Sequence, residues 1–160
     1  MSDIPSKPLE DTSTPLTQAA GHPPSTQFVI DGKAPETVVY PASIAEVSRL
    51  LKEANDHGRA ISPVGHGAFL HLGGVPKRYE RALCTTELNT IVDYQPTDMT
   101  ITVGAGMSLA QLQAILGENG QWLPLDPPCP ERATVGGVIA ANLNGPARLS
   151  QGTVRDFLIG

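Results

Sequence analysis

Residues 133–160 read ATVGGVIAANLNGPARLSQGTVRDFLIG, and this stretch carries the strongest indication of the fold. The segment TVGG at residues 134–137 is suited to start a short helix that runs to about Asn142, with free N–H groups turned toward an anion or the polar edge of a ring. Ala140 and Ala141 keep that helix slim, so a bulky flat ligand can lie against it. The stretch predicts either a ligand-facing wall or a tightly packed small-residue helix, and the residues alone leave both open.

Glycine and arginine follow that helix. Gly145 and Gly152 permit the loop to pass close to another group. Arg148 and Arg155 place positive charge nearby, whereas under the alternative interpretation they are ordinary surface residues.

A second glycine-rich segment, SPVGHGAFLHLGG at residues 62–74, follows a predicted strand. Gly65 and Gly67 let the backbone approach a ligand and turn its N–H groups inward, as in the backbone nests that bind phosphate oxygens. No Lys or Arg lies within this loop, so a pyrophosphate here is expected to be held mainly by amides. An ordinary strand–turn connection is the alternative. The chain has neither G-x-x-x-x-G-K-[ST] nor a strand-linked G-x-G-x-x-G, which argues against a Walker nucleotidase and a Rossmann site.

The histidines and cysteines do not predict a metal site or a nucleophile. His66 and His71 lie in a loop with no Glu or Asp at metal-helix spacing, so we interpret them as exposed or packing residues rather than as ligands or bases. Cys84 lies in a strand-like segment and is expected in the core. Cys129 lies between prolines in an expected loop, without the further ligands that zinc needs.

Hydrophobic periodicity and turn residues predict a mixture of strands and helices. The strands are expected at residues 28–30, 38–40, 60–64, 81–86, 89–96 and 99–104. Asp31 and Gly32 indicate a turn, and residues 121–137 an extended segment stiffened by proline. This order of elements predicts an α+β ligand-binding domain.

Two helices carry clear start signals. Ser43 and Glu46 form a capping box for a helix that ends before Gly58, and Ser108 and Gln111 form one for a helix over residues 108–120. The apolar stripes expected to face the core are Ile44, Val47, Leu50, Leu51 and Ala54 in the first helix, and Leu109, Leu112, Ile115 and Leu116 in the second. Arg49 and Glu53 are expected to pair on the outside of the first helix.

The composition limits the class of protein. The 160 residues suit one domain, or one domain with a tail, and residues 1–26 form a Pro-, Ser- and Thr-rich segment expected to be a disordered leader. A net charge of −5 without a Lys/Arg-rich run argues against a nucleic-acid partner. Two cysteines favour a reducing compartment, and the N-terminus lacks the apolar core of a signal peptide. No apolar run reaches the roughly 20 residues of a membrane helix, so a cytoplasmic protein is expected.

Three segments, taken in order, resemble a known family. VVYPASIAEVSRLLKEANDHGRAISPVGHGAFLHLGG, TITVGAGMSLAQLQAILGENGQWLPLDPP and ATVGGVIAANLNGPARLSQGTVRDFLIG resemble the FAD-binding domain of the vanillyl-alcohol oxidase and para-cresol methylhydroxylase (PCMH) superfamily. Within it, the resemblance is greatest to the FAD-binding subunit of bacterial glycolate oxidase and related 2-hydroxy-acid dehydrogenases. It implies an α+β, two-subdomain PCMH-type fold with FAD between the subdomains, over residues 27–160 and incomplete at its C-terminus.

The resemblance also implies which residues contact FAD. The loop from Pro63 to Phe69 is expected to wrap the pyrophosphate through backbone amides, and later segments are expected to pass along the pyrophosphate, the ribityl chain and the ring. The expected residues are Pro63, Val64, Gly65, His66, Gly67, Ala68, Phe69, Pro127, Pro128, Thr134, Val135, Gly136, Gly137, Ala141, Asn142, Gly145, Arg148, Thr153, Val154, Arg155 and Asp156. No catalytic residue and no metal ligand is assigned.

The chain departs from the family pattern in two places. His66 stands where the family loop has the middle of three glycines, which predicts backbone strain if that position needs a positive φ. Some relatives attach FAD covalently to a His whose counterpart here falls near Ala68, so non-covalent FAD is expected. Relatives continue beyond residue 160 with more strands. The residues expected to expose an unpaired edge here are Val154, Phe157, Leu158 and Ile159.

The family implies a redox function. A 2-hydroxy acid such as glycolate or D-lactate gives a hydride to the flavin, and the electrons pass to a quinone, an iron–sulfur partner or oxygen. The expected partners are further oxidoreductase subunits, including an iron–sulfur subunit, or a separate C-terminal fragment, with attachment to the inner membrane only through those partners. The alternative is a truncated, non-catalytic remnant or binding module that keeps the fold without activity of its own.

Overall fold

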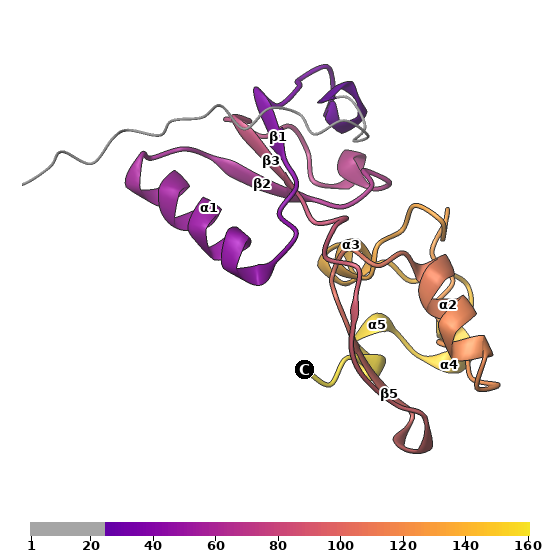
Figure 1. The fold of residues 1–160 in the computed structure, drawn as a ribbon. Helices are drawn as coiled ribbons and strands as arrows, with labels where there is room; N and C mark the ends of the chain where they lie inside the picture. Colours follow the sequence, from indigo (N-terminus) through magenta and orange to yellow (C-terminus); the bar gives the residue numbers. More distant parts are fainter. Residues whose placement is uncertain (1–24) are drawn as a thin grey trace, which may run out of the picture.

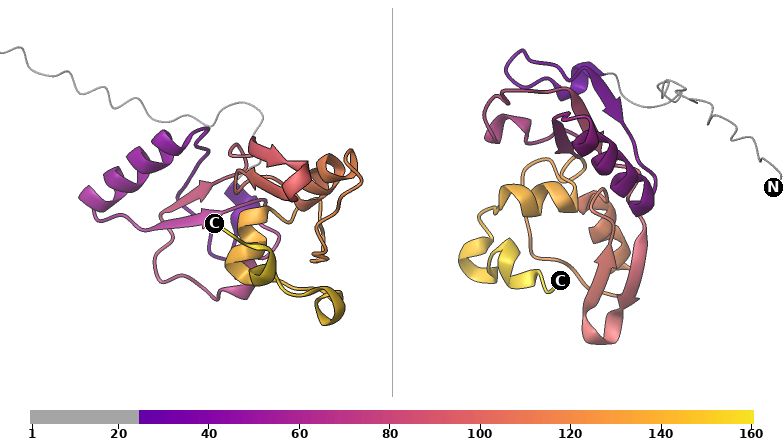
Figure 2. Two further views of the ribbon diagram at one scale, coloured as in Figure 1. Left: turned by 90° about the horizontal axis from the view of Figure 1, so that it is seen from below. Right: turned by 90° about the vertical axis from the view of Figure 1, so that its left-hand side faces the viewer.

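Two small sheets, each with its own helices, form two lobes in the computed structural model, which describes residues 25–160 (Figure 1). The leader expected over residues 1–26 lies outside the described residues except for its last two, which belong to the short 3₁₀ helix η1 (Ser25–Phe28). The right-hand view of Figure 2 shows the N-terminal lobe, mostly indigo to magenta, above the C-terminal lobe, which runs from pink to yellow. The chain is thus an α+β fold with two subdomains.

The N-terminal lobe is built on a parallel sheet of three strands. β1 (Thr37–Val39), β3 (Arg81–Cys84) and β2 (Ile61–Val64) pair in the order β1-β3-β2. All four residues of β3 are buried, as expected for the central strand of a covered parallel sheet. Helix α1 (Ile44–Asp56) connects β1 to β2 and covers one face of the sheet (Figure 1).

Helix α1 confirms most of the pattern predicted for it. The Ser43 side chain accepts a hydrogen bond from the amide of Glu46 at 3.2 Å, and Gly58 takes a φ of 62° just after the helix. Leu50 and Ala54 are buried, but the wider stripe is wrong because Ile44 is 75% exposed and Leu51 49% exposed. A three-stranded sheet offers too little surface to cover a stripe of that width.

The ion pair expected on the outside of α1 is also wrong. Glu53 pairs with Arg81 of β3, at 3.3 Å between Oε1 and Nη1, rather than with Arg49 of its own helix. The Arg81 side chain is only 9% exposed, so pairing it with a carboxylate offsets the cost of burying its charge.

The other face of this sheet is covered by the segment before β1. Phe28 is fully buried there, and the Tyr79 hydroxyl donates a hydrogen bond to its carbonyl at 3.0 Å. The strand expected at residues 28–30 is wrong, because Phe28 ends η1 and Ile30 forms only an isolated bridge with Lys33. The turn at residues 31–32 is confirmed, since both residues take a positive φ and close the chain on itself too tightly for a longer ladder.

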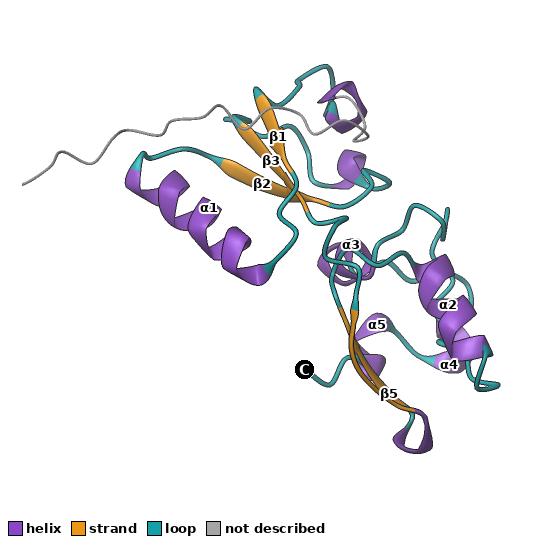
Figure 3. Ribbon diagram, viewed as in Figure 1, coloured by secondary structure: helices purple, strands orange, loops and turns teal. Residues whose placement is uncertain are grey.

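The C-terminal lobe combines a two-stranded antiparallel sheet with short helices. Strands β4 (Ile91–Gln95) and β5 (Thr100–Val103) are joined by the 3₁₀ helix η3 (Pro96–Asp98). The helices are α2 (Leu109–Gly117), α3 (Val135–Ala141), α4 (Arg148–Gln151) and α5 (Val154–Phe157). The proline-stiffened segment predicted over residues 121–137 contains neither helix nor strand as far as residue 134, and α3 begins at Val135 (Figure 3).

Helices α2 and α3 confirm their predicted positions. Ser108 caps α2 by accepting a hydrogen bond from the Gln111 amide at 3.1 Å, and Leu109, Leu112 and Leu116 are buried in the core of the lobe. Ile115 packs against that core while partly exposed.

The end of the chain differs from the expected unpaired strand edge. Val154 starts α5 and is 4% exposed, because Thr153 and Asp156 form a capping box that begins a helix. The amide of Thr153 donates to Asp156 Oδ2 at 2.7 Å. The expected edge is therefore wrong for Val154–Phe157, and α4 also replaces part of the expected loop.

The buried residue Gly106 joins the two lobes. The amide of Gly106 donates to the Leu88 carbonyl at 2.9 Å, and a Cβ on Gly106 would overlap the Thr85 carbonyl. The turn that follows β3 therefore packs directly on the backbone that follows β5.

Replacing Gly106 with alanine tests this junction. Gly106→Ala should lower the free energy of unfolding by about 1–3 kcal/mol, because the added methyl group displaces backbone that has no room to move. Urea unfolding followed by circular dichroism measures the change. Gly117→Ala is the matched control, because nothing lies within 4 Å of its added Cβ. Equal midpoints for both variants would contradict the proposed junction.

Candidate cofactor-binding site

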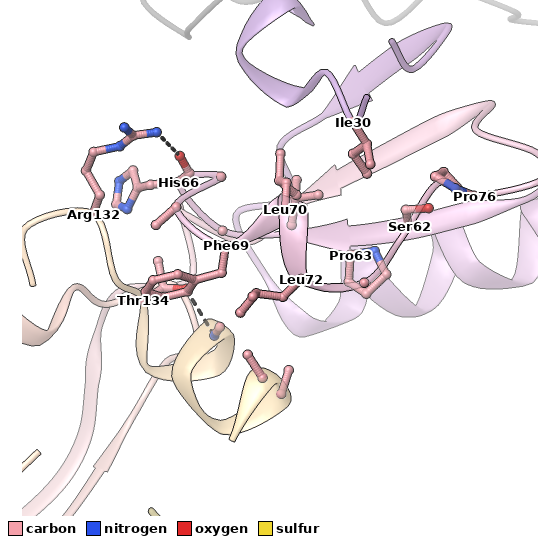
Figure 4. Close-up of a pocket in the computed structure, with 18 of the residues that line it drawn as sticks. Ile30, Ser62, Pro63, His66, Phe69, Leu70, Leu72, Pro76, Arg132 and Thr134 are labelled. Carbon is pink, nitrogen blue, oxygen red and sulfur yellow. Dashed lines mark hydrogen bonds between the residues drawn. The ribbon is translucent and has the colours of Figure 1, made fainter. Parts of the chain in front are cut away.

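A cleft of about 550 Å³ lies between the two lobes, a size typical of small-molecule and cofactor sites (Figure 4). One side is the loop that follows β2, and the other is α3 with the residues just before it. The lining residues are Ile30, Ser62, Pro63, Val64, Gly65, His66, Gly67, Ala68, Phe69, Leu70, Leu72, Gly73, Gly74, Pro76, Arg132, Thr134, Gly137, Ala140 and Ala141.

The segment from Gly65 to Phe69, here named the amide loop, has five backbone N–H groups without a protein acceptor. Among residues 25–160, none of these N–H groups donates a hydrogen bond to another protein group. Helices and strands do not continue through the loop, so these donors are available to a ligand. Free amides in a glycine-containing loop agree with the predicted phosphate nest.

Two carbonyl groups of the amide loop, those of Gly65 and His66, are in contrast held by side chains. The Cys84 thiol donates to the Gly65 carbonyl at 3.5 Å, and burial raises the pKa of that thiol, which keeps it protonated. The His66 carbonyl accepts from Gln27 Nε2 at 3.0 Å and from Arg132 Nη2 at 3.3 Å. The C=O and N–H of a trans peptide point in opposite directions, so fixing these carbonyls also fixes the direction of the His66 and Gly67 amides.

Thr134 connects the amide loop to α3. Its hydroxyl accepts a hydrogen bond from the Gly137 amide at 3.2 Å and so caps the helix, while the side chain is 3% exposed. The same side chain lies against Gly65, where any Cβ would overlap its hydroxyl and methyl groups. Gly65 is therefore needed for close approach of the two lobes.

The strain expected at His66 is wrong. The positive φ of the loop falls on Gly67, at 74°, and His66 is not among the non-glycine residues with positive φ in the described part of the chain. Because the turn needs its glycine one position later, a side chain at residue 66 is tolerated.

The His66 ring is buried enough to favour its neutral form. Its Nδ1 atom is buried and has no hydrogen-bond partner among the described residues. Burial lowers the pKa of His66, and the nearby charge of Arg132 lowers it further. His66 is thus a packing residue with one unsatisfied ring nitrogen, and not the exposed histidine that was the other expectation. His71 is exposed.

Arg132 is the lining residue that the sequence analysis missed most clearly. The loop itself contains no cation, but the fold brings Arg132 to it from 66 residues away. Figure 4 shows its guanidinium beside the carbonyl of His66. Its place directly before the ATVGG segment was the available signal.

Ten of the residues expected to contact the cofactor line this cleft. They are Pro63, Val64, Gly65, His66, Gly67, Ala68, Phe69, Thr134, Gly137 and Ala141. Residues before and after these segments, such as Ile30, Leu72 and Ala140, complete the lining and were not expected from the sequence.

The other expected residues lie outside the lining of the cleft. They are Pro127, Pro128, Val135, Gly136, Asn142, Gly145, Arg148, Thr153, Val154, Arg155 and Asp156. Several of them have packing contacts within the C-terminal lobe. Gly136 packs on Ala105, and Gly145 lies against Asp126. Val135 and Val154 line a smaller apolar cavity beside β5. Arg148 and Arg155 are exposed.

Comparison with known proteins agrees with this geometry. A family model described as an FAD binding domain matches residues 35–160. The chain belongs to this family. FAD is therefore its cofactor, and the cleft with its free amides has the chemistry that an anionic pyrophosphate requires. Among residues 25–160, no helix is long and apolar enough to cross a membrane.

Curated relatives of this FAD-binding domain are redox enzymes by name. It is 46% identical over 71 residues to glycolate oxidase subunit GlcE of Escherichia coli (strain K12), covering 44% of this chain and 20% of that protein. It is 30% identical to glycolate oxidase subunit GlcD of Bacillus subtilis (strain 168), covering 79% of this chain and 27% of that protein. D-lactate dehydrogenase of Archaeoglobus fulgidus is 35% identical over 76% of this chain and 27% of that protein.

A solved structure of alkyldihydroxyacetonephosphate synthase has the same fold over most of the chain. The TM-score is 0.69 at 27% sequence identity, over 77% of this chain and 25% of that one. The FAD-binding domain described here thus spans about a quarter of the length of the proteins it matches.

The His66 imidazole should make stability depend on pH. Because the folded pKa lies below the ordinary value of 6.5, the unfolded state takes up a proton first as the pH falls. The free energy of unfolding should therefore decrease as the pH falls from about 7.5 through the unfolded pKa to the lower folded pKa. His66→Asn should flatten this dependence, as measured by urea unfolding between about pH 7.5 and 5.5.

His71→Asn, which removes an exposed imidazole from the same part of the chain, is the matched control for the substitution. Hydrogen bonds hold the pKa of Glu80 below 4.5 and that of Asp156 below 3.8. Protonation of these carboxyl groups therefore changes the free energy of unfolding only below the pH range tested. If the free energy of unfolding of His66→Asn depends on pH as that of the wild type does, the His66 imidazole has the same pKa in the folded and unfolded states, and the prediction is wrong.

Proposed function

We propose that this chain forms the flavin-binding part of an oxidoreductase that acts on 2-hydroxy acids of the glycolate or D-lactate type. The observation that carries the proposal is the amide loop, with five unpaired N–H groups beside a cleft of cofactor size. The relatives' names support the substrate class, because glycolate, D-lactate and D-2-hydroxyglutarate are all 2-hydroxy acids.

The amide loop is proposed to hold the FAD pyrophosphate. The N–H groups of Gly65–Phe69 would donate to phosphate oxygens, since a negative charge is stabilised by several converging backbone dipoles. Gly137, Ala140 and Ala141 line the opposite wall with small side chains, which leave room for a flat or extended ligand. When bound, FAD supplies the acceptor for the hydride that leaves the 2-hydroxy acid.

The expected residues outside the cleft are proposed to support its wall. Gly136 brings the start of α3 against Ala105, and its amide donates to the Ala105 carbonyl at 2.8 Å. The Val154 amide donates to Asn144 Oδ1 at 2.8 Å, which ties α5 to the loop after α3. These contacts hold α3 at a defined distance from the amide loop.

Partner subunits are part of the proposal. Two relatives are named as subunits of glycolate oxidase, and the chain spans about a quarter of the relatives' length. We therefore propose that substrate binding and electron transfer require further polypeptide, such as an iron–sulfur subunit or a C-terminal fragment. Attachment to a membrane would then occur through such partners, with this chain in the cytoplasm.

Gly65→Ala tests the site. The added methyl group overlaps Thr134, so we expect it to push the amide loop away from α3 and weaken FAD binding at least tenfold, the effect of losing about one charge-assisted hydrogen bond. Titration of the purified apoprotein with FAD, followed by flavin fluorescence, measures the dissociation constant.

Gly117→Ala is the matched control, because Gly117 lies outside the lining of the cleft and nothing lies within 4 Å of its added Cβ. It should bind FAD as the wild type does. Wild-type protein that takes up no FAD would overturn the proposed role of the cleft and favour a non-catalytic remnant. Bleaching of bound flavin by glycolate or D-lactate, alone or after addition of a C-terminal fragment, tests the substrate class.

We also propose that FAD is held without a covalent bond. The counterpart of the histidine that some relatives link to flavin is expected near Ala68, whose methyl group cannot form that bond. Acid precipitation should therefore release the yellow flavin into the supernatant. Yellow colour that stays in the pellet would contradict this prediction, and peptide mass spectrometry would then show whether His66 or His71 carries it.

A further inference from the structure

We propose that Arg132 supplies the positive charge of the phosphate-binding site, an inference that rests on the proposed function of the cleft. The amide loop offers only partial charges from its N–H groups, whereas an FAD pyrophosphate carries full negative charges. The exposed Arg132 side chain lies beside the amide loop, where its positive charge can balance the negative charge of the phosphates.

The other residues that line the cleft contribute no competing charge near Arg132. Among residues 25–160, Arg132 is the one Lys or Arg that lines it, and no Asp or Glu of this range does so. The other ionisable group there is His66, whose pKa is lowered and whose ring is therefore neutral near pH 7. A phosphate bound at the amide loop would meet one full positive charge and no negative side chain.

The Arg132 guanidinium has N–H donors beyond the one that it uses in the structure. It presents five N–H groups, of which the structure uses one at 3.3 Å on the His66 carbonyl. The side chain is exposed, so it can reorient while its backbone stays fixed by the Arg132 amide, which donates to the Cys129 carbonyl at 2.9 Å. A second contact to a phosphate oxygen at the adjacent amides is therefore compatible with the fold.

Arg132 is not needed merely to position the loop. Gln27 donates to the same His66 carbonyl at 3.0 Å, a shorter bond than the 3.3 Å of Arg132. If Arg132 only fixed this peptide, its loss would be partly replaced by Gln27 and would act equally at every salt concentration. If it acts through charge, its effect should be large at low salt and small at high salt, because salt screens an exposed charge.

The experiment compares dissociation constants for FAD and for ADP, which carries a pyrophosphate but no flavin, between low and high salt. Arg132→Gln should weaken the binding of both ligands about tenfold at low salt and much less at high salt. Arg132→Lys keeps the charge and should retain most of the salt dependence. Gln27→Ala should change affinity by a similar factor at all salt concentrations.

Arg49→Gln is the matched control, since it removes an exposed arginine from α1 outside the cleft and should bind both ligands as the wild type does. Circular dichroism of each variant excludes loss of folding. The inference is overturned if Arg132→Gln binds within twofold of the wild type at low salt, loses affinity equally at all salt concentrations, or weakens FAD but not ADP. Wild-type protein that binds neither ligand overturns the proposed function itself and this inference with it.

Discussion

The contact between Gly65 and Thr134 is the constraint on which the cleft depends. One threonine side chain caps α3 through the Gly137 amide at 3.2 Å and fills the space that a Cβ at residue 65 would take. The helix start and the loop after β2 are therefore held by the same few atoms. Any change that moves Thr134 alters both walls of the cleft at once, because its side chain contacts both.

In two peptides of the amide loop, the carbonyl is bonded to the protein while the N–H group of the same peptide is left for a ligand. The carbonyls of Gly65 and His66 are bonded to Cys84, Gln27 and Arg132, while the neighbouring N–H groups have no acceptor within residues 25–160. Partly buried donors without partners lower the stability of the protein by itself. An anion that satisfies them is bound only by the folded state, so it raises stability by mass action.

The parts of this structure that depend on local rules were predictable. The helix starts at Ser43 and Ser108 follow from their serine N-caps, and the amide loop follows from glycines after a strand. The missed features depend on tertiary contacts. Glu53 forms its ion pair with Arg81 of β3 rather than with Arg49 of its own helix. Arg132 contacts His66 of the loop although 66 residues separate the two in the sequence. The helix at Val154 was missed although Thr153 and Asp156 have capping-box spacing, because the apolar run after it also suits a strand.

The use of backbone groups explains which residues of the loop are constrained and which are not. A site made of N–H groups does not depend on the side chains that bear them, so His66 fits where a glycine was expected. Constraint falls instead on Gly65, where Thr134 leaves no space, and on Gly67, where φ is 74°. The net charge of −5 does not oppose an anionic ligand here, because the field within a cleft is set by the groups that line it. Those groups are oriented amides, a neutral imidazole and one arginine.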